Sequence, residues 1–173
     1  KTAVAQHKAL ALVSLMEATG MRISDAAMLR RDAVTGEAGE FWVSFLAIKN
    51  GRRVSLLLPS DAVDLLNTLP STRSSTTNFI PEYYFHSPAS KPARTIFRTG
   101  RLLRQVFKLS GVEGAHSHRF RHTLASNLAA KGADIRLIAA ILGDTVAVAE
   151  RHYIHLTEGY KERVREAMLG VRG

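Results

Sequence analysis

The sequence predicts an α+β fold that is mainly α-helical and carries a small antiparallel β-sheet, a hairpin, on one side. Apolar residues recur every three or four positions through most of the chain, as in residues 2–18, which is the period of an amphipathic helix. Only between Phe41 and Leu58 does the period shorten to two, on both sides of Asn50 and Gly51. The 173 residues, 46% of them hydrophobic, are enough for a core. We therefore expect a single domain.

The N-terminal half is expected to hold three helices and the hairpin. Ser24 and Ser60 are good helix N-caps, and Gly20 and Pro70 stand where helices end. The pair Asn50-Gly51 favours a tight two-residue turn between two strands. The expected elements are a helix over residues 2–18, a short helix over 24–30, the hairpin over 41–58 and a helix over 60–69.

The C-terminal half is expected to be helical after a loop. Residues 70–91 are rich in Ser and Thr and contain several prolines, so we expect a loop with one short strand there. Beyond it, the apolar residues return to helical spacing, with Leu103 and Phe107 turned inward in the first helix. The expected helices cover residues 93–109, 120–131, 134–142, 146–151 and 158–168.

Composition narrows the class of partner. The chain has 24 Lys and Arg against 15 Asp and Glu, a formal charge of +9, which favours binding to polyanions. Nucleic acid is the first expectation. A membrane is the second, but no apolar run approaches the roughly 20 residues of a spanning helix. The chain has no cysteine, which excludes disulfides, thiolate nucleophiles and cysteine zinc sites and suits a reducing, cytoplasmic setting.

One stretch of the sequence combines groups that suit phosphate chemistry without a metal. His118 and Arg121 lie in the run HRFRH, which is followed by Leu142-Gly143-Asp144 and then by Tyr153. A guanidinium can neutralise charge on a phosphodiester under attack, an imidazole can move a proton, and a phenol can hold the phosphoryl group covalently. Tyr153 is preferred over the other tyrosines because it follows Leu142-Gly143 and a short expected helix, with Arg151, His152 and His155 around it. The rival nucleophiles are Tyr83, Tyr84 and Tyr160.

These residues resemble a known family. The run TGMRISD at residues 19–25, Lys49 at the hairpin turn, the run HRFRHT at 118–123, Leu142-Gly143 and then Tyr153 follow the order of the tyrosine recombinase catalytic domain, in the phage integrase family. The order matches over nearly the whole chain. The resemblance implies that residues 1–173 are the catalytic domain, a C-terminal fragment that lacks an N-terminal DNA-binding domain. The apolar pattern that begins directly after Lys1 favours such a fragment.

The resemblance also implies a reaction and the residues that perform it. Tyr153 would attack a DNA phosphate and form a 3′-phosphotyrosyl link, with neither a metal nor another cofactor. Arg22 and Arg121 would bind the non-bridging oxygens, His118 would assist proton transfer with the tyrosine, and Lys49 would protonate the leaving oxygen. The partner would be double-stranded DNA. The family further implies a tetramer on DNA, and we expect the fragment alone to be a monomer in solution.

Several supporting roles have competing interpretations. Asp25 either braces the site, as in the family, or complements the dipole of the short helix. Lys49 is otherwise a solvated charge beside the strand end. The basic residues expected to contact DNA are Arg52, Arg53, Arg119 and Arg151. Residues 157–173 form an amphipathic segment that could pack on a neighbouring subunit or on its own core.

The histidines also allow a metal site. His116, His118 and His122 have spacings that zinc ligands use. The positive charges of Arg119 and Arg121 between them would repel a cation, so we expect no metal there. His122 is expected to be structural, donating a hydrogen bond to a backbone or core partner.

Asp144 departs from the family pattern. The family carries His or Trp directly after Leu-Gly, and an ionised Asp cannot donate a hydrogen bond to a phosphate oxygen. We expect Asp144 to be the N-cap that positions the helix leading to Tyr153. One alternative to the recombinase is a DNA-binding protein that Asp144 makes weakly active or inactive. Two others are a type IB topoisomerase with the same pocket and a metal phosphodiesterase.

Overall fold

The computed structural model describes residues 2–37, 39–70, 82–87, 89–156, 164–166 and 168–169. In the described part, helices predominate and one antiparallel sheet has the strand order β1-β2-β3, so the expected α+β class is confirmed. The helices are α1 (Thr2–Thr19), α2 (Ile23–Ala27), α3 (Ser60–Asn67), α4 (Pro92–Ser110), α5 (Ser117–Ala130), α6 (Ile135–Leu142) and α7 (Val146–Tyr153). The strands are β1 (Val34–Glu37), β2 (Glu40–Leu46) and β3 (Arg53–Leu58), and two 3-10 turns cover Arg31–Ala33 and Ile154–Leu156.

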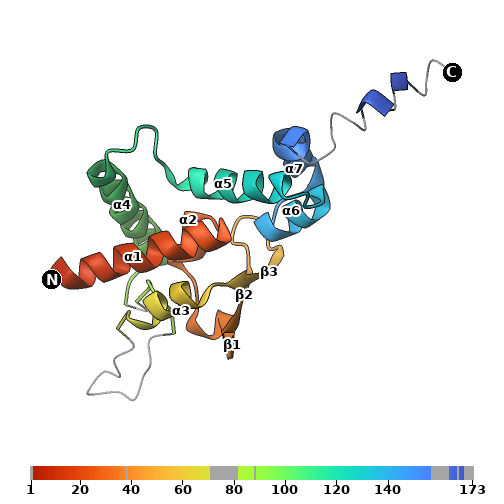
Figure 1. The fold of residues 1–173 in the computed structure, drawn as a ribbon. Coiled ribbons are helices and arrows are strands. Elements are labelled where there is room, and N and C mark those ends of the chain that lie inside the picture. Colours follow the sequence, from red (N-terminus) through yellow and green to blue (C-terminus); the bar gives the residue numbers. More distant parts are fainter. Residues whose placement is uncertain are drawn as a thin grey trace.

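Helix α1 is the centre of the fold. It contacts α3 and β3 on one side and α5 on the other, and α4 crosses it near its N-terminal half (Figure 1). Helices α6 and α7 continue from α5, and α6 also contacts β3 (Figure 1). The chain therefore brings β3 close to α6, although residues 59–134 lie between them in sequence.

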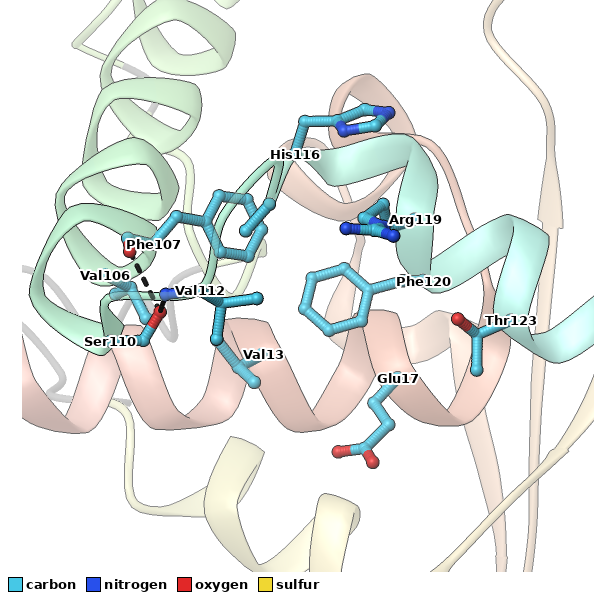
Figure 2. A pocket seen from close by; sticks show the side chains of 11 residues that line it. Val13, Glu17, Val106, Phe107, Ser110, Val112, His116, Arg119, Phe120 and Thr123 are labelled. Carbon is cyan, nitrogen blue, oxygen red and sulfur yellow. Dashed lines mark hydrogen bonds between the residues drawn. The ribbon is translucent and has the colours of Figure 1, made fainter.

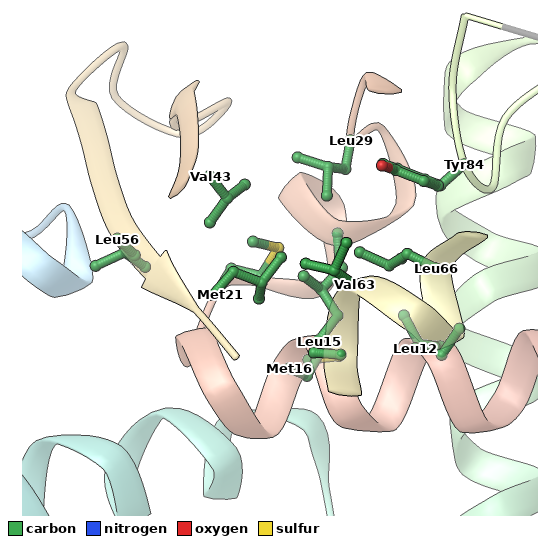
Figure 3. Packing of buried hydrophobic residues seen from close by; sticks show 14 of the residues in the cluster. Leu12, Leu15, Met16, Met21, Leu29, Val43, Leu56, Val63, Leu66 and Tyr84 are labelled. Atoms are coloured by element: carbon green, nitrogen blue, oxygen red, sulfur yellow. The ribbon is translucent and has the colours of Figure 1, made fainter. Parts of the chain in front are cut away.

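The main core lies between α1, the sheet and α3. Leu12, Leu15 and Met16 on α1 are fully buried and face Val43, Leu56 and Leu66 from the strands and α3 (Figure 3). In β2 and β3 the inward residues alternate with exposed ones, and Val43 pairs with Leu56 in the register. Burying one such leucine side chain contributes about 1.5–3 kcal/mol. The alternation seen in the sequence is thus the packing pattern of a sheet covered on one face.

A second, smaller core joins α5, α6 and α7. Its buried members are Ala125, Ala129, Ile138, Ala139, Leu142, Ala149 and Tyr153. The alanines of α5 allow close helix packing, and Asp134 caps α6 by accepting the Arg136 N–H at 2.7 Å. The ring of Tyr153 belongs to this core, and its buried position fixes where the hydroxyl lies.

The hairpin differs from the expected tight turn. Six residues, 47–52, join β2 to β3, and the Gly51 N–H donates to the Ala47 carbonyl at 2.7 Å. The Asn50 side chain accepts the Arg52 N–H at 3.2 Å within the loop, and its amide donates to the Gly143 carbonyl at 2.9 Å. The prediction of a two-residue Asn-Gly turn is wrong because this tertiary contact holds the loop open. Strand β1, which the sequence analysis did not predict, pairs with β2.

Two helix starts also differ from expectation. Arg22, not Ser24, is the N-cap of α2, because the Arg22 carbonyl accepts the first helical N–H, that of Ala26. Ser60 is the first residue of α3, after Pro59 at the cap. Helix α5 begins at Ser117, three residues earlier than predicted, so His118 lies in its first turn.

The remaining boundaries agree within a few residues, and two expectations are only partly covered. In residues 82–87 and 89–91 the structure has an isolated bridge between Arg30 and Tyr83 in place of a strand. Residues 71–81 and most of the helix expected over 158–168 lie outside the described residues.

Candidate active site

Arg121 is an almost fully buried arginine on α5. Its Nη2 donates to the Leu142 carbonyl at 2.6 Å and its Nη1 to the Gly20 carbonyl at 3.3 Å. Gly20 lies so close that a Cβ there would be 3.3 Å from the Arg121 Cα. Because burying a charge without partners is unfavourable, these carbonyls and one carboxylate are what hold the guanidinium in place.

Arg22 approaches the same point from the other side of the fold. It lies in the extended segment just before α2, and its side chain is 12% exposed. Its Nη2 forms an ion pair with Oδ1 of Asp144 at 2.5 Å, and the Arg121 Nη2 forms one with Oδ2 at 2.5 Å. One carboxylate therefore bridges the two arginines, and each of its oxygens binds one guanidinium.

Asp144 does not cap α7. The N-cap is Thr145, whose Oγ1 accepts the Val148 N–H at 3.2 Å, so the expected capping role of Asp144 is wrong. A cap would have satisfied one backbone N–H, whereas the side chain here points between two guanidiniums that need an anion more strongly. The backbone of Asp144 is held separately, with its N–H donating to the Ala139 carbonyl at 2.9 Å.

Asp25 fixes the loop that carries Lys49. Its carboxylate is buried and accepts the Ile48 N–H at 2.9 Å. Burial raises the pKa of Asp25, while that hydrogen bond and the charges of Arg22 and Arg121 act in the opposite direction. Lys49 itself is exposed on the 47–52 loop. Asp25 thus lies beside both arginines and is bonded to the residue before Lys49.

His118 lies within electrostatic reach of the same cations. Desolvation lowers the pKa of His118, and the charge of Arg121 lowers it further. Smaller contributions to the lowered pKa come from His116, Arg22 and Lys49. The structure therefore places the two arginines and Lys49 within electrostatic reach of His118.

Tyr153 is paired with His122 rather than with a backbone group. Its hydroxyl lies 2.8 Å from Nδ1 of His122, and the tyrosine is 5% exposed. Burial raises the pKa of Tyr153, the charge of Arg121 lowers it, and the charge of Asp144 raises it. Desolvation lowers the pKa of His122, and neighbouring histidines lower it further. The lowered pKa of His122 favours its neutral form, in which a ring nitrogen can accept a proton.

The sequence analysis missed this pairing and the arginine bridge. His122 and Tyr153 are 31 residues apart, and Arg22 and Asp144 are 122 apart. Residue types and spacing alone carry no signal for either contact. His122 was expected to bond to a backbone or core partner, and its partner is a core residue that is also the candidate nucleophile, Tyr153.

The four arginines expected to contact DNA lie in different surroundings. Arg52 donates to the Asp144 carbonyl at 3.2 Å, and Arg119 donates to the Glu113 carbonyl at 3.1 Å. Arg53 and Arg151 are exposed on β3 and α7. Arg52 thus lies at the edge of the candidate site, and its guanidinium helps to hold the segment after Gly143.

A separate cavity of about 590 Å³ lies between α1, α4 and the start of α5. Phe107, Phe120 and Val13 form its apolar wall, and His116 and Arg119 lie at its rim (Figure 2). Neither of the two bridged arginines nor Tyr153 lines it. The cavity is therefore distinct from the candidate active site.

Neither a metal-ligand cluster nor a membrane-spanning helix is found among the described residues. No group of three or more His, Asp or Glu side chains there is arranged to hold a metal ion. No helix in that part of the chain is both long and apolar enough to cross a membrane.

Comparisons with known proteins agree on one family. The sequence model of the phage integrase family matches residues 1–159. A tyrosine recombinase from Pseudothermotoga lettingae is 28% identical over 156 residues, covering 87% of this chain and 50% of that protein. Tyrosine recombinase XerC from Pediococcus pentosaceus is 29% identical over 171 residues, covering 91% and 52%. This chain thus spans about half the length of the curated relatives it matches.

The fold also matches a solved structure. The post-cleavage complex of XerH site-specific recombinase with its palindromic difH substrate aligns with a TM-score of 0.68, covering 97% of this chain and 47% of that one. The sequences are 19% identical, so this comparison supports the fold alone.

Proposed function

This chain belongs to the phage integrase family, and we propose that it is the catalytic domain of a site-specific DNA recombinase, which cleaves and rejoins DNA through a 3′-phosphotyrosyl intermediate. The observation that carries the proposal is the convergence of Arg22 and Arg121 on one anion, within electrostatic reach of Tyr153. Fixed guanidiniums stabilise the charge that builds on a phosphodiester under attack.

In the proposed cleavage step, the hydroxyl oxygen of Tyr153 attacks the phosphorus atom. A bond forms between that oxygen and phosphorus, and the bond from phosphorus to the 5′ oxygen breaks. The phenol proton passes to Nδ1 of His122, which lies 2.8 Å away, and Lys49 gives a proton to the leaving 5′ oxygen. His118, which lies within electrostatic reach of the two arginines, is proposed to assist proton transfer with the tyrosine.

Rejoining reverses these steps. A 5′ hydroxyl of the same strand, or of a partner strand, attacks the phosphotyrosine and releases Tyr153. The intermediate keeps the energy of the broken bond, so the proposed reaction needs neither ATP nor a metal. Asp25 is proposed as a positioning residue, because it holds the Ile48 N–H next to Lys49.

The proposed partner is double-stranded DNA, in keeping with the formal charge of +9 and with a fold shared with a DNA-bound recombinase. Strand exchange requires two duplexes, so we also propose self-association on DNA, as a tetramer. The relatives are about twice as long as this chain, so residues 1–173 are proposed to be the catalytic domain of a longer protein. A cytoplasmic location follows from DNA as the proposed substrate.

Trapping the intermediate tests the proposal. After cleavage, a nicked suicide duplex loses the short fragment that carries the free 5′ hydroxyl, so rejoining cannot occur. We therefore expect a covalent protein–DNA adduct to accumulate in the presence of EDTA. Because only Tyr153 is proposed to bond to phosphorus, Tyr153→Phe should abolish the adduct. Denaturing electrophoresis of labelled DNA measures it. Tyr83→Phe, on a half-buried tyrosine elsewhere, is the matched control and should retain it. An adduct that persists in Tyr153→Phe contradicts the assignment.

The role of His122 predicts an acid limb in the pH profile. A protonated imidazole cannot accept the phenol proton, and the pKa of His122 is lowered from about 6.5. Adduct formation should therefore fall with decreasing pH only below 6.5 and be flat near neutral pH. His122→Asn should lower the neutral rate by roughly a hundredfold or more and remove the acid limb.

The control for this measurement is His7→Asn, an exposed histidine on α1, which should leave the profile unchanged. His118 also has a lowered pKa, so it is the other residue whose titration could produce an acid limb. An acid limb and a neutral rate that both survive in His122→Asn would assign the titrating group to another residue, and the proposed proton acceptor would be wrong.

A further inference from the structure

The Asp144 carboxylate binds Arg22 and Arg121 in the way that a phosphate group would. Each guanidinium gives one nitrogen to a separate oxygen of Asp144, both at 2.5 Å, as two non-bridging oxygens of a phosphodiester would be held. We propose that the Asp144 carboxylate is an internal occupant of the phosphate-binding site and that the incoming DNA phosphate displaces it. This inference rests on the proposed function, since it takes the arginine pair to be the site for the phosphate that reacts.

The exchange needs only a rotation of one side chain. The backbone of Asp144 is held by the hydrogen bond to Ala139 at 2.9 Å and by the Arg52 guanidinium on its carbonyl at 3.2 Å. Neither bond involves the carboxylate, whose side chain is 15% exposed and so borders solvent. The carboxylate can therefore leave the arginines without disturbing the segment between α6 and α7.

Arg121 keeps its position when the carboxylate leaves. Arg121 is still bonded to the Gly20 and Leu142 carbonyls, which fix its guanidinium independently of Asp144. Asp25 remains nearby as a buried acid that interacts with both arginines. The fixed guanidinium of Arg121 then faces the vacated position together with Arg22, and any anion that binds there competes with Asp144.

The competition can be measured without catalysis. Inorganic phosphate is the probe, titrated by calorimetry at constant ionic strength. Asp144→Ala removes the internal competitor, so it should bind phosphate about tenfold or more tightly than the unaltered chain, because charge-assisted hydrogen bonds to the arginines become available. Its melting temperature should be lower without phosphate, since two cations lose their partner, and should rise with phosphate.

Three variants isolate the site. Asp32→Ala removes a carboxylate from another arginine, the exposed Arg30, and should leave phosphate affinity unchanged. Adding Arg22→Ala to Asp144→Ala should abolish the gain. If Asp144→Ala fails to fold, Asp144→Asn, which has the same size without the charge, provides the measurement and should also bind phosphate more tightly.

Equal phosphate affinity in the unaltered chain and in the folded Asp144 variants would overturn the inference. So would a gain that survives Arg22→Ala, because the phosphate would then bind elsewhere. Both outcomes are independent of the adduct assay. A chain that exchanges Asp144 for phosphate but forms no adduct through Tyr153 would contradict the proposed function alone.

Discussion

Replacing Arg121 with lysine is expected to reduce formation of the covalent adduct by roughly a hundredfold or more, because a preorganised donor to the transition state is lost. Arg121 reaches the Gly20 and Leu142 carbonyls and the Asp144 carboxylate from two nitrogens of one planar group. An ammonium group has one nitrogen and cannot hold this fork. The measurement is the initial rate of adduct formation on the nicked duplex.

Arg136→Lys provides the control for this substitution. Arg136 is an exposed residue on α6, so the same chemical change there should leave the rate within a few fold of the unaltered chain. Circular dichroism and the melting temperature establish that the Arg121 variant is folded when its rate is measured. A folded Arg121→Lys variant with an unchanged rate would show that the buried fork is structural.

Replacing Gly143 with alanine is expected to lower the free energy of unfolding by about 2–4 kcal/mol, from backbone strain and overpacking together. Gly143 ends α6 with φ at +60°, where a Cβ is unfavourable. That Cβ would also lie 2.7 Å from Cγ2 of Val54 on β3. Chemical denaturation of both proteins measures the difference.

Gly111→Ala separates the two causes. Gly111 ends α4 with φ at +66°, but a Cβ there meets no atom within 4 Å. It should therefore show the backbone effect of about 1–2 kcal/mol without the clash. In a protein that already carries Val54→Ala, Gly143→Ala should lower the free energy of unfolding by less than it does in the unaltered chain. The effect of Gly111→Ala should be the same in both backgrounds. Equal losses in the two glycine variants would contradict the close approach of α6 to the sheet.

The sequence predicted the elements better than the contacts between them. The period of apolar residues identified most of the helices and strands β2 and β3, because burial on one face of an element leaves a local pattern. The loop after β2 was mispredicted, since its shape depends on Asn50 binding Gly143 and on Asp25 binding Ile48. Such contacts join segments that are distant in sequence, so no residue spacing in the sequence predicts them.

The candidate site follows the same division. Family motifs identified Arg22, Arg121 and Tyr153 as candidates, and the structure brings the two arginines together. The absence of a donor at position 144 was also visible in the sequence. That Asp144 binds both arginines could not be predicted, because a carboxylate after a helix is equally suited to capping, and only the tertiary fold decides between the two.

The residues of the candidate site are divided between the two hydrophobic cores, so the stability of the site differs from that of the whole fold. Tyr153 belongs to the smaller core of α5, α6 and α7, whereas the segment around Arg22 and the Lys49 loop belongs to the larger one. Small groups of packed helices open as cooperative units well before a whole domain unfolds. An opening of α6 and α7 would break the Arg22–Asp144 ion pair and carry Tyr153 away from Arg22. We therefore expect the local stability of these two short helices to limit the fraction of molecules that are competent to react.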